Sequence, residues 1–200
     1  MRVNWAERIL YILWGDYFNS DWKHRTTKWT EQFNKLNEKE SFKLWLQHQT
    51  NLINNIASDF PVDVMYLSGN HDDLKQQALS DAIDIYYSKD DRVNINNDDE
   101  FRKYYERGKT TIGAGHWDWV KEKDILSVFS QEQWLNEYNY YLKWHIHHAL
   151  KQMYGNLLIE TFSTPSNPWE RDKKMWYITP WKIVWQMYSK EEWKYGEFQK

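Results

Sequence analysis

Short apolar runs in the first half of the chain end at turn-forming residues. The runs over residues 8–13 and 62–67 are followed by Gly15-Asp16 and by Ser68-Gly69-Asn70, respectively. Apolar runs of this length that stop at such residues are typical of buried strands. A third, shorter strand is predicted over residues 92–96.

The stretches between these strands show helical periodicity. Apolar residues without intervening Gly or Pro predict one long helix, or two stacked helices, from about residue 30 to residue 57. A second helix is predicted over residues 72–87. Its apolar face is predicted to consist of Leu74, Ala78, Ala82, Ile83 and Tyr86.

The second half of the chain has a different order of elements. Residues 101–105 and 110–114 flank a turn near Gly108 and predict a hairpin. Further predictions are a helix over 121–133 and strands over 138–146, 155–161 and 181–188, with a Pro-rich loop at 163–174. Strand–helix units followed by hairpins indicate a layered, mixed α/β fold. We expect a single domain over residues 1–200.

Composition narrows the function classes. Lys and Arg number 26 and Asp and Glu 29, so the net charge of −3 gives no basic field for a nucleic-acid coat or a membrane-surface binder. This net charge is compatible with a protein that binds a nucleic-acid substrate at one local site. The absence of Cys excludes disulfides, thiolate metal sites and Cys nucleophiles. The longest apolar run, residues 9–14, is far below the roughly 20 residues of a membrane span. We therefore expect a cytoplasmic protein without a membrane partner.

Polar residues that can bind a metal gather where the predicted strands end. They are Asp16, Asn70, His71, His116, His145 and His147. Taken singly, each has an ordinary interpretation as a turn residue or a solvated histidine, but four of the seven histidines occupy such positions. Because ligands bind at the carboxyl ends of strands in layered α/β sheets, these side chains can converge there. A carboxylate, an amide oxygen and several imidazoles suit Mn, Fe or Zn.

Four motifs containing these residues occur in a characteristic order. They are Gly15-Asp16, Gly69-Asn70-His71-Asp72, Gly115-His116 and Trp144-His145-Ile146-His147. This order resembles the calcineurin-like metallophosphoesterase superfamily, whose pattern is D-x-H, G-D, G-N-H-[DE], a lone H and G-H-x-H. Residues 15–30, and Arg102-Lys103-Tyr104-Tyr105 before Gly108, further resemble a phage-type branch. The resemblance extends from residue 9 to about residue 188.

The resemblance implies an α/β fold, a metallophosphoesterase-type sandwich of mixed β-sheets flanked by helices. It also implies roles for individual residues. Asp16 would bridge two metal ions, with Asn70, His116 and His145 completing the shell of one ion and His147 binding the other. His71 would lie beside the metals and protonate the leaving oxygen or stabilise the transition state, and Asp72 would orient the His71 ring.

The implied activity is metal-dependent hydrolysis of a phosphoester, with a phosphodiester favoured. The implied cofactors are two divalent metal ions, Mn, Fe, Zn or Ni, with manganese favoured; such a pair activates a water and clamps the phosphoryl group. Nucleic acid, cyclic nucleotide and phosphoprotein all stay open as substrates, and so does the oligomeric state. The alternatives are a non-catalytic binding module that keeps the fold, and a mononuclear metal protein of unrelated chemistry.

The chain departs from the family pattern before Asp16. Only fifteen residues precede Asp16, and none of them forms the D-x-H motif or its strand. Two ligands of the His147 metal are therefore missing. We expect that the protein starts upstream of Met1 and that the chain is truncated. The alternative is a protein with one good metal site and weak or no activity.

The second departure concerns tryptophan. The chain has 14 Trp and only 7 Gly, whereas ordinary composition would give about 14 Gly at this length. Trp29, Trp117 and Trp144 stand where the family pattern has glycine, at positions that need close backbone approach or a positive φ. Two hypotheses follow. These tryptophans are genuine core or stacking residues, or they are UGA codons that the native host reads as glycine.

Overall fold

A computed structural model describes residues 6–21, 23, 25, 26, 28, 29, 31, 36–116, 122–144, 149–162 and 184–199. The chain divides into two compact units, Met1–Phe101 and Arg102–Lys200. The described residues form three helices and ten strands in three sheets, which confirms the predicted mixed α/β class. The single domain predicted over residues 1–200 stays a prediction.

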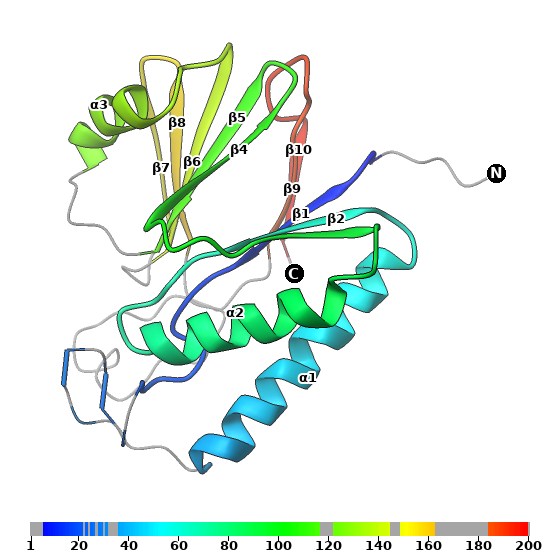
Figure 1. Cartoon of the computed structure of the whole chain (residues 1–200). Coiled ribbons are helices and arrows are strands. Elements are labelled where there is room, and N and C mark those ends of the chain that lie inside the picture. Colours follow the sequence, from blue (N-terminus) through cyan, green and yellow to red (C-terminus); the bar gives the residue numbers. More distant parts are fainter. Residues whose placement is uncertain are drawn as a thin grey trace. The chain divides into compact units, whose positions relative to one another are not determined.

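The first unit is built on a three-stranded parallel sheet. Its strands β1 (Ile9–Leu13), β2 (Val62–Tyr66) and β3 (Val93–Asn96) follow one another in sequence order across the sheet. Helix α1 (Glu38–Ala57) connects β1 to β2, and α2 (Asp73–Tyr87) connects β2 to β3. Both helices lie on the same face of the sheet (Figure 1). This placement is expected because crossovers of one hand that progress in one direction put their helices on one side.

The core of the first unit lies between this sheet and the two helices. Alternate residues of β2 point into it, as the period of two in a strand requires, and they meet one stripe from each helix. The main buried residues are Leu13, Ile53, Ala57, Val62, Val64, Tyr66, Leu79, Ile83 and Tyr87. None of the helices that the structure describes combines the length and the apolar character needed to cross a membrane.

The buried face of α2 differs from the predicted one. Leu74 and Tyr86 are 63% and 62% exposed, so the predicted face is wrong at these residues and at the exposed Ala78. Ile83 is buried as predicted, and Ala82 is half-buried. The face turned inward includes Gln76, which is fully buried and donates from Nε2 to the Trp14 carbonyl at 3.1 Å. A polar residue inside the apolar stripe shifted the apparent periodicity by one position. Its hydrogen bond to the end of β1 explains why the polar side chain is tolerated there.

Helix α1 begins later than its apolar periodicity suggests. Asn37 is its N-cap, and its side chain accepts from the Glu40 amide at 2.9 Å. The Glu40 carboxylate in turn accepts from the Asn37 amide, which completes a capping box. The capping residues therefore set the start of the helix at Glu38, and the prediction of helix from about residue 30 is wrong at residues 31, 36 and 37. Residues 30 and 32–35 lie outside the described residues.

The second unit contains a five-stranded mixed sheet of order β4-β5-β6-β8-β7. The predicted hairpin is confirmed as the antiparallel pair β4–β5, whereas β6 pairs in parallel with β5 and β8. The elements are β4 (Arg102–Arg107), β5 (Thr110–Gly115), α3 (Glu122–Glu132), β6 (Tyr138–Trp144), β7 (Leu150–Tyr154) and β8 (Leu157–Phe162). Two further strands, β9 (Val184–Met187) and β10 (Gly196–Gln199), form a separate antiparallel pair. Strands β7 and β10 were not predicted.

The two faces of the five-stranded sheet are covered by different elements. On one face, Ile125 and Phe129 of α3 pack against a cluster that includes Tyr141. On the other face the neighbouring residue Tyr140 packs edge-on against Tyr188 and Trp193, with ring centroids 4.6 and 5.6 Å apart. Successive residues of β6 therefore serve opposite layers, as strand geometry requires.

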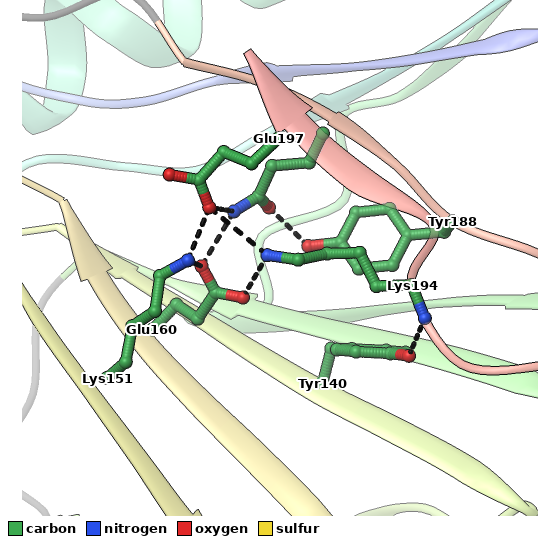
Figure 2. A network of polar contacts seen from close by, with 7 residues as sticks. Tyr140, Lys151, Glu160, Tyr188, Lys194 and Glu197 are labelled. Carbon is green, nitrogen blue, oxygen red and sulfur yellow. Dashed lines mark hydrogen bonds and ion pairs between the residues drawn. The ribbon is translucent and has the colours of Figure 1, made fainter. Parts of the chain in front are cut away.

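A network of charges around the buried Glu160 joins β8 to the β9–β10 pair. Glu160 is fully buried and accepts from Gln186 Nε2 at 2.7 Å, while Lys151 Nζ lies 3.1 Å from it and Lys194 Nζ also contacts it. Figure 2 shows that Glu197 completes the network by contacting both lysines. Two carboxylates and two ammonium groups balance in charge, which is the condition for burying an ion such as Glu160.

Glu160→Gln is expected to destabilise the second unit by about 3 kcal/mol, because it leaves the lysine charges around position 160 without their buried counter-charge. Thermal unfolding of the variant checks this. The matched control is Glu191→Gln, at an exposed position of the same unit. Equal melting temperatures for the two variants would show that the network contributes no stability.

A second charged cluster in the same unit predicts a pH dependence. Arg102 Nε donates to both oxygens of Glu132, at 3.0 and 2.7 Å, and the Tyr104 hydroxyl donates to one of them at 2.6 Å. The Arg102 hydrogen bonds hold the pKa of Glu132 below its ordinary value. A lowered folded-state pKa gives stability that is present above the unfolded-state pKa and is lost as pH falls through the folded-state pKa.

Glu132→Gln is therefore expected to cost about 1 kcal/mol at pH 7, a modest figure because the pair is partly exposed. The difference from the unchanged protein should shrink as the pH falls below about 4.3, the ordinary glutamate pKa. Denaturant unfolding at a series of pH values measures it. The exposed Glu192→Gln serves as control, and a pH-independent difference would contradict the prediction.

Candidate functional site

The ends of β1 and β2 meet through two glycines. Because the strands are parallel, the chain leaves both at the same edge, and the Leu67 amide donates to the Leu13 carbonyl at 3.0 Å just beyond the ladder. A Cβ atom on Gly15 would lie 2.1 Å from the Gly69 nitrogen, and one on Gly69 would lie 2.3 Å from the Asp16 nitrogen. Only glycine allows this approach, which brings Asp16 next to the segment after Gly69.

Asp16 has a left-handed backbone, with φ of +67°, and Asn19 follows with φ of +55°. Aspartate and asparagine adopt this conformation more readily than other non-glycine residues. One carboxylate oxygen of Asp16 accepts from the His71 amide at 2.9 Å. This hydrogen bond joins the two predicted motifs G-D and G-N-H-D directly.

The Asp72 side chain binds the main chain of the loop that follows β1. Its Oδ1 accepts from the Asp16 amide at 2.9 Å and its Oδ2 accepts from the Phe18 amide at 2.7 Å. Both Asp72 oxygens are thus engaged by main-chain amides, and the prediction that Asp72 orients the His71 ring stays a prediction. The His71 ring lies with Nδ1 3.3 Å from the Asn19 carbonyl.

The environment of Asp72 raises its pKa to about 7. Burial is the largest cause, since desolvation disfavours the carboxylate, and the nearby charge of Asp16 acts in the same direction. The amides of Phe18 and Asp16 partly oppose the rise. Two carboxyl groups, those of Asp16 and Asp72, thus lie close together at the strand ends, and the uncharged form of Asp72 is favoured.

Lys75 is a residue of this site that the sequence patterns missed. Its amide, in the first turn of α2, donates to the Asp21 carboxylate at 3.0 Å. Its ammonium group donates to the Ser20 carbonyl at 2.7 Å and lies 2.8 Å from Glu38. The loop after β1 is therefore wrapped around the start of α2. The only sequence signal for Lys75 is its position one turn after the G-N-H-D motif.

The side-chain oxygen of Asn70 is a candidate metal ligand. This atom, Oδ1, is buried and has no hydrogen-bond partner among the residues that the structure describes. A buried acceptor of this kind is rare in folded proteins and requires an explanation. A divalent cation would satisfy it, since carboxylate and amide oxygens are suitable ligands for manganese. Asp16 and Asn70 therefore fit the predicted metal site.

The predicted imidazole ligands belong to the second unit. His116 follows β5 and is buried, and the Trp144 ring lies edge-on to it at a centroid distance of 4.9 Å. The Trp144 Nε1 atom is buried without an acceptor in the described part of the chain. His145 and His147 lie outside the described residues. Within the described ranges no group of three or more His, Cys, Asp and Glu side chains is arranged to hold a metal, so their convergence with Asp16 stays a prediction.

No protein-family model matches the sequence, and no curated protein is significantly similar to it. Inference about function therefore depends on the strand-end residues themselves. Within the first unit, the predicted residues Asp16, Asn70, His71 and Asp72 do come from two strand ends that the structure brings together.

Proposed function

We propose that the protein is a metal-dependent phosphoester hydrolase, with a phosphodiester as the favoured substrate. The observation that carries this proposal is the junction of β1 and β2, where the His71 amide bonds to Asp16 and the buried Asn70 oxygen lacks a partner among the described residues. A carboxylate, an amide oxygen and an imidazole at one sheet edge form a suitable start for such a site. Membership of the calcineurin-like superfamily, with its layered sandwich, is part of the proposal.

The proposed ligands for two divalent ions, with manganese favoured, are Asp16, Asn70, His116, His145 and His147. When bound, such ions supply an activated water and neutralise charge on the phosphoryl group. Asn70 contributes an oxygen without adding negative charge beside a phosphate. This matters because Asp16 already supplies a carboxylate there, and its charge raises the pKa of the neighbouring Asp72.

His71 is the proposed proton donor to the leaving oxygen. Its Nδ1 faces the Asn19 carbonyl, an acceptor only, so the proton of the neutral ring is held on Nδ1. To act as a donor, the ring must carry a second proton on Nε2; this proton passes to the leaving oxygen and leaves the neutral ring protonated on Nδ1. The main chain of His71 is fixed by its amide hydrogen bond to Asp16, which keeps the ring next to the proposed metal ligands.

The test is hydrolysis of an aryl phosphodiester by the full chain, with Mn²⁺ added and then removed by a chelator. We expect turnover that requires the metal and is lost in Asp16→Asn. The matched control, Asp91→Asn, changes an exposed aspartate of the same unit and should keep full activity. Absence of turnover with each of Mn²⁺, Fe²⁺, Zn²⁺ and Ni²⁺ would refute the proposal and favour a non-catalytic binding module.

A further inference from the structure

We propose that Asp72 is a positioning residue, which holds Asp16 in its ligating conformation through the main chain. This inference rests on the proposed function, because it assigns Asp16 to the metal. Asp72 reaches across 56 residues of sequence to the Asp16 amide and 54 to the Phe18 amide. A carboxylate offers acceptors only, so it can serve both amides at once.

The position of Asp72 makes this use of its side chain unusual. Asp72 is the N-cap residue of α2, where an aspartate ordinarily accepts from amides in the first turn of its own helix. Here its side chain makes no such bond. The amide of Lys75 is instead served by Asp21 of the loop after β1. Asp72, at the start of α2, therefore accepts from amides of the loop after β1, and Asp21 of that loop accepts from an amide of α2. These hydrogen bonds hold the two segments together.

The exchange fixes Asp16 from two sides. Its amide donates to Asp72, and its carboxylate accepts from the amide of His71. Together these bonds stabilise the left-handed backbone at Asp16, which is intrinsically less favourable than a right-handed one. Loss of the Asp72 carboxylate should therefore free the Asp16 side chain to leave the ligating orientation, without removing any proposed ligand.

Asp72→Asn tests the proposal, because the amide group replaces one acceptor by a donor that faces a main-chain N–H. We expect faster hydrogen exchange at the amides of residues 16 and 18, and Mn²⁺ affinity lower by about 10–100-fold. Asp72→Ser is a second variant, since serine is a good N-cap that keeps α2 but cannot serve both loop amides. Asp73→Asn, the next residue, is the control and should keep the affinity of the unchanged chain.

The readouts separate this inference from the proposed function. Unchanged exchange at residues 16 and 18 in both Asp72 variants overturns the positioning role, whatever the activity. Unchanged Mn²⁺ affinity in both variants overturns it as well. A chain that binds Mn²⁺, loses affinity on Asp72→Asn and hydrolyses no phosphoester would refute the hydrolase proposal and support the positioning role.

A separate observation leads to a second inference: we infer that position 29 is occupied by glycine in the native protein. The Trp29 amide donates to the Thr26 carbonyl at 2.8 Å, and Arg25 and Glu31 form an antiparallel bridge. Trp29 has φ of +64° and is 71% exposed. A left-handed residue that follows a tight turn in a hairpin is ordinarily glycine, and a large aromatic residue there is a genuine outlier.

Two other tryptophans, unlike Trp29, pack against aromatic rings. Trp45 packs on Tyr17 with ring centroids 4.6 Å apart, and Trp193 packs on both Tyr138 and Tyr140. Trp29 has an Arg25 guanidinium 5.7 Å from its ring centroid and is not part of the core cluster that the described residues of the first unit form. Within the described residues, it is the one tryptophan with a positive φ. A UGA codon read as glycine explains both this backbone and the excess of Trp over Gly.

Trp29→Gly should raise the melting temperature by about 2–4 °C, because glycine adopts this φ without strain. Trp29→Ala is the matched control: it also removes the indole but keeps a Cβ, and it should give no such gain. The codon at position 29, and the peptide mass from the native host, should specify UGA and glycine. A UGG codon, or a Trp29→Gly variant no more stable than Trp29→Ala, overturns the inference.

Discussion

Replacement of His71 by glutamine is expected to lower kcat for Mn²⁺-dependent phosphodiester hydrolysis by about 10²–10⁴-fold, the usual contribution of a positioned proton donor. Glutamine approximates the size of the ring but cannot transfer a proton. The hydrogen bond from the main-chain amide of residue 71 to Asp16 does not depend on the side chain, so the loop should keep its conformation. The effect should therefore fall on kcat, with Mn²⁺ affinity preserved.

Steady-state kinetics beside a Mn²⁺ titration measures both quantities. The control is His48→Gln, an exposed histidine of α1 in the same unit, which should keep kcat within about twofold of the unchanged chain. A His71 variant with reduced metal affinity and unchanged kcat at saturating Mn²⁺ would contradict the assignment, because it would make His71 a ligand rather than a proton donor.

Gly15→Ala is expected to disrupt the first unit, at a cost above about 4 kcal/mol. The added Cβ would lie 2.1 Å from the nitrogen and 2.2 Å from the Cα of Gly69, and 2.6 Å from the Ser68 carbonyl carbon. All three are main-chain atoms of the neighbouring strand end, so no side-chain rotation relieves the overlap. Either the strand ends separate or the unit does not fold.

Circular dichroism and thermal unfolding check this expectation. Gly196→Ala, in β10, is the control, because the nearest atom to its Cβ would be Met187 Cε at 3.5 Å, an ordinary contact with a flexible side chain. If the Gly15→Ala variant had the same melting temperature as Gly196→Ala, the ends of β1 and β2 would not be in close contact.

Much of the secondary structure could be predicted, because strands β1, β2 and β3 are short apolar runs bounded by turns. The edge strand β7 could not: Leu150 and its next three residues are all exposed, so no alternation marks it. The four-residue β10 is too short for a pattern. The inner face of α2 was also misjudged, since a buried Gln76 gives no apolar signal until its partner, the Trp14 carbonyl, is known.

Some residues of the candidate site could also be predicted from sequence, and others could not. Asp16, Asn70 and His71 could be found from sequence, because Asp16 and Asn70 each follow a glycine at a strand end and His71 is the next residue. The role of Asp72 could not be predicted from sequence. Whether its carboxylate caps α2, orients an imidazole or binds a distant loop depends on which groups the tertiary contacts bring near it. Lys75 was missed for the same reason, because its contacts are with a loop more than fifty residues away.

These long-range hydrogen bonds also have a kinetic meaning. The hydrogen bonds that join the loop after β1 to the segment before and at the start of α2 span 52 to 56 residues. The whole of α1 lies between the two segments in sequence. Closing so large a segment is slow compared with forming α1 itself. The loop should thus be among the last parts of the first unit to become protected from solvent exchange during refolding. A fragment that ends before β2 would have no means of forming it.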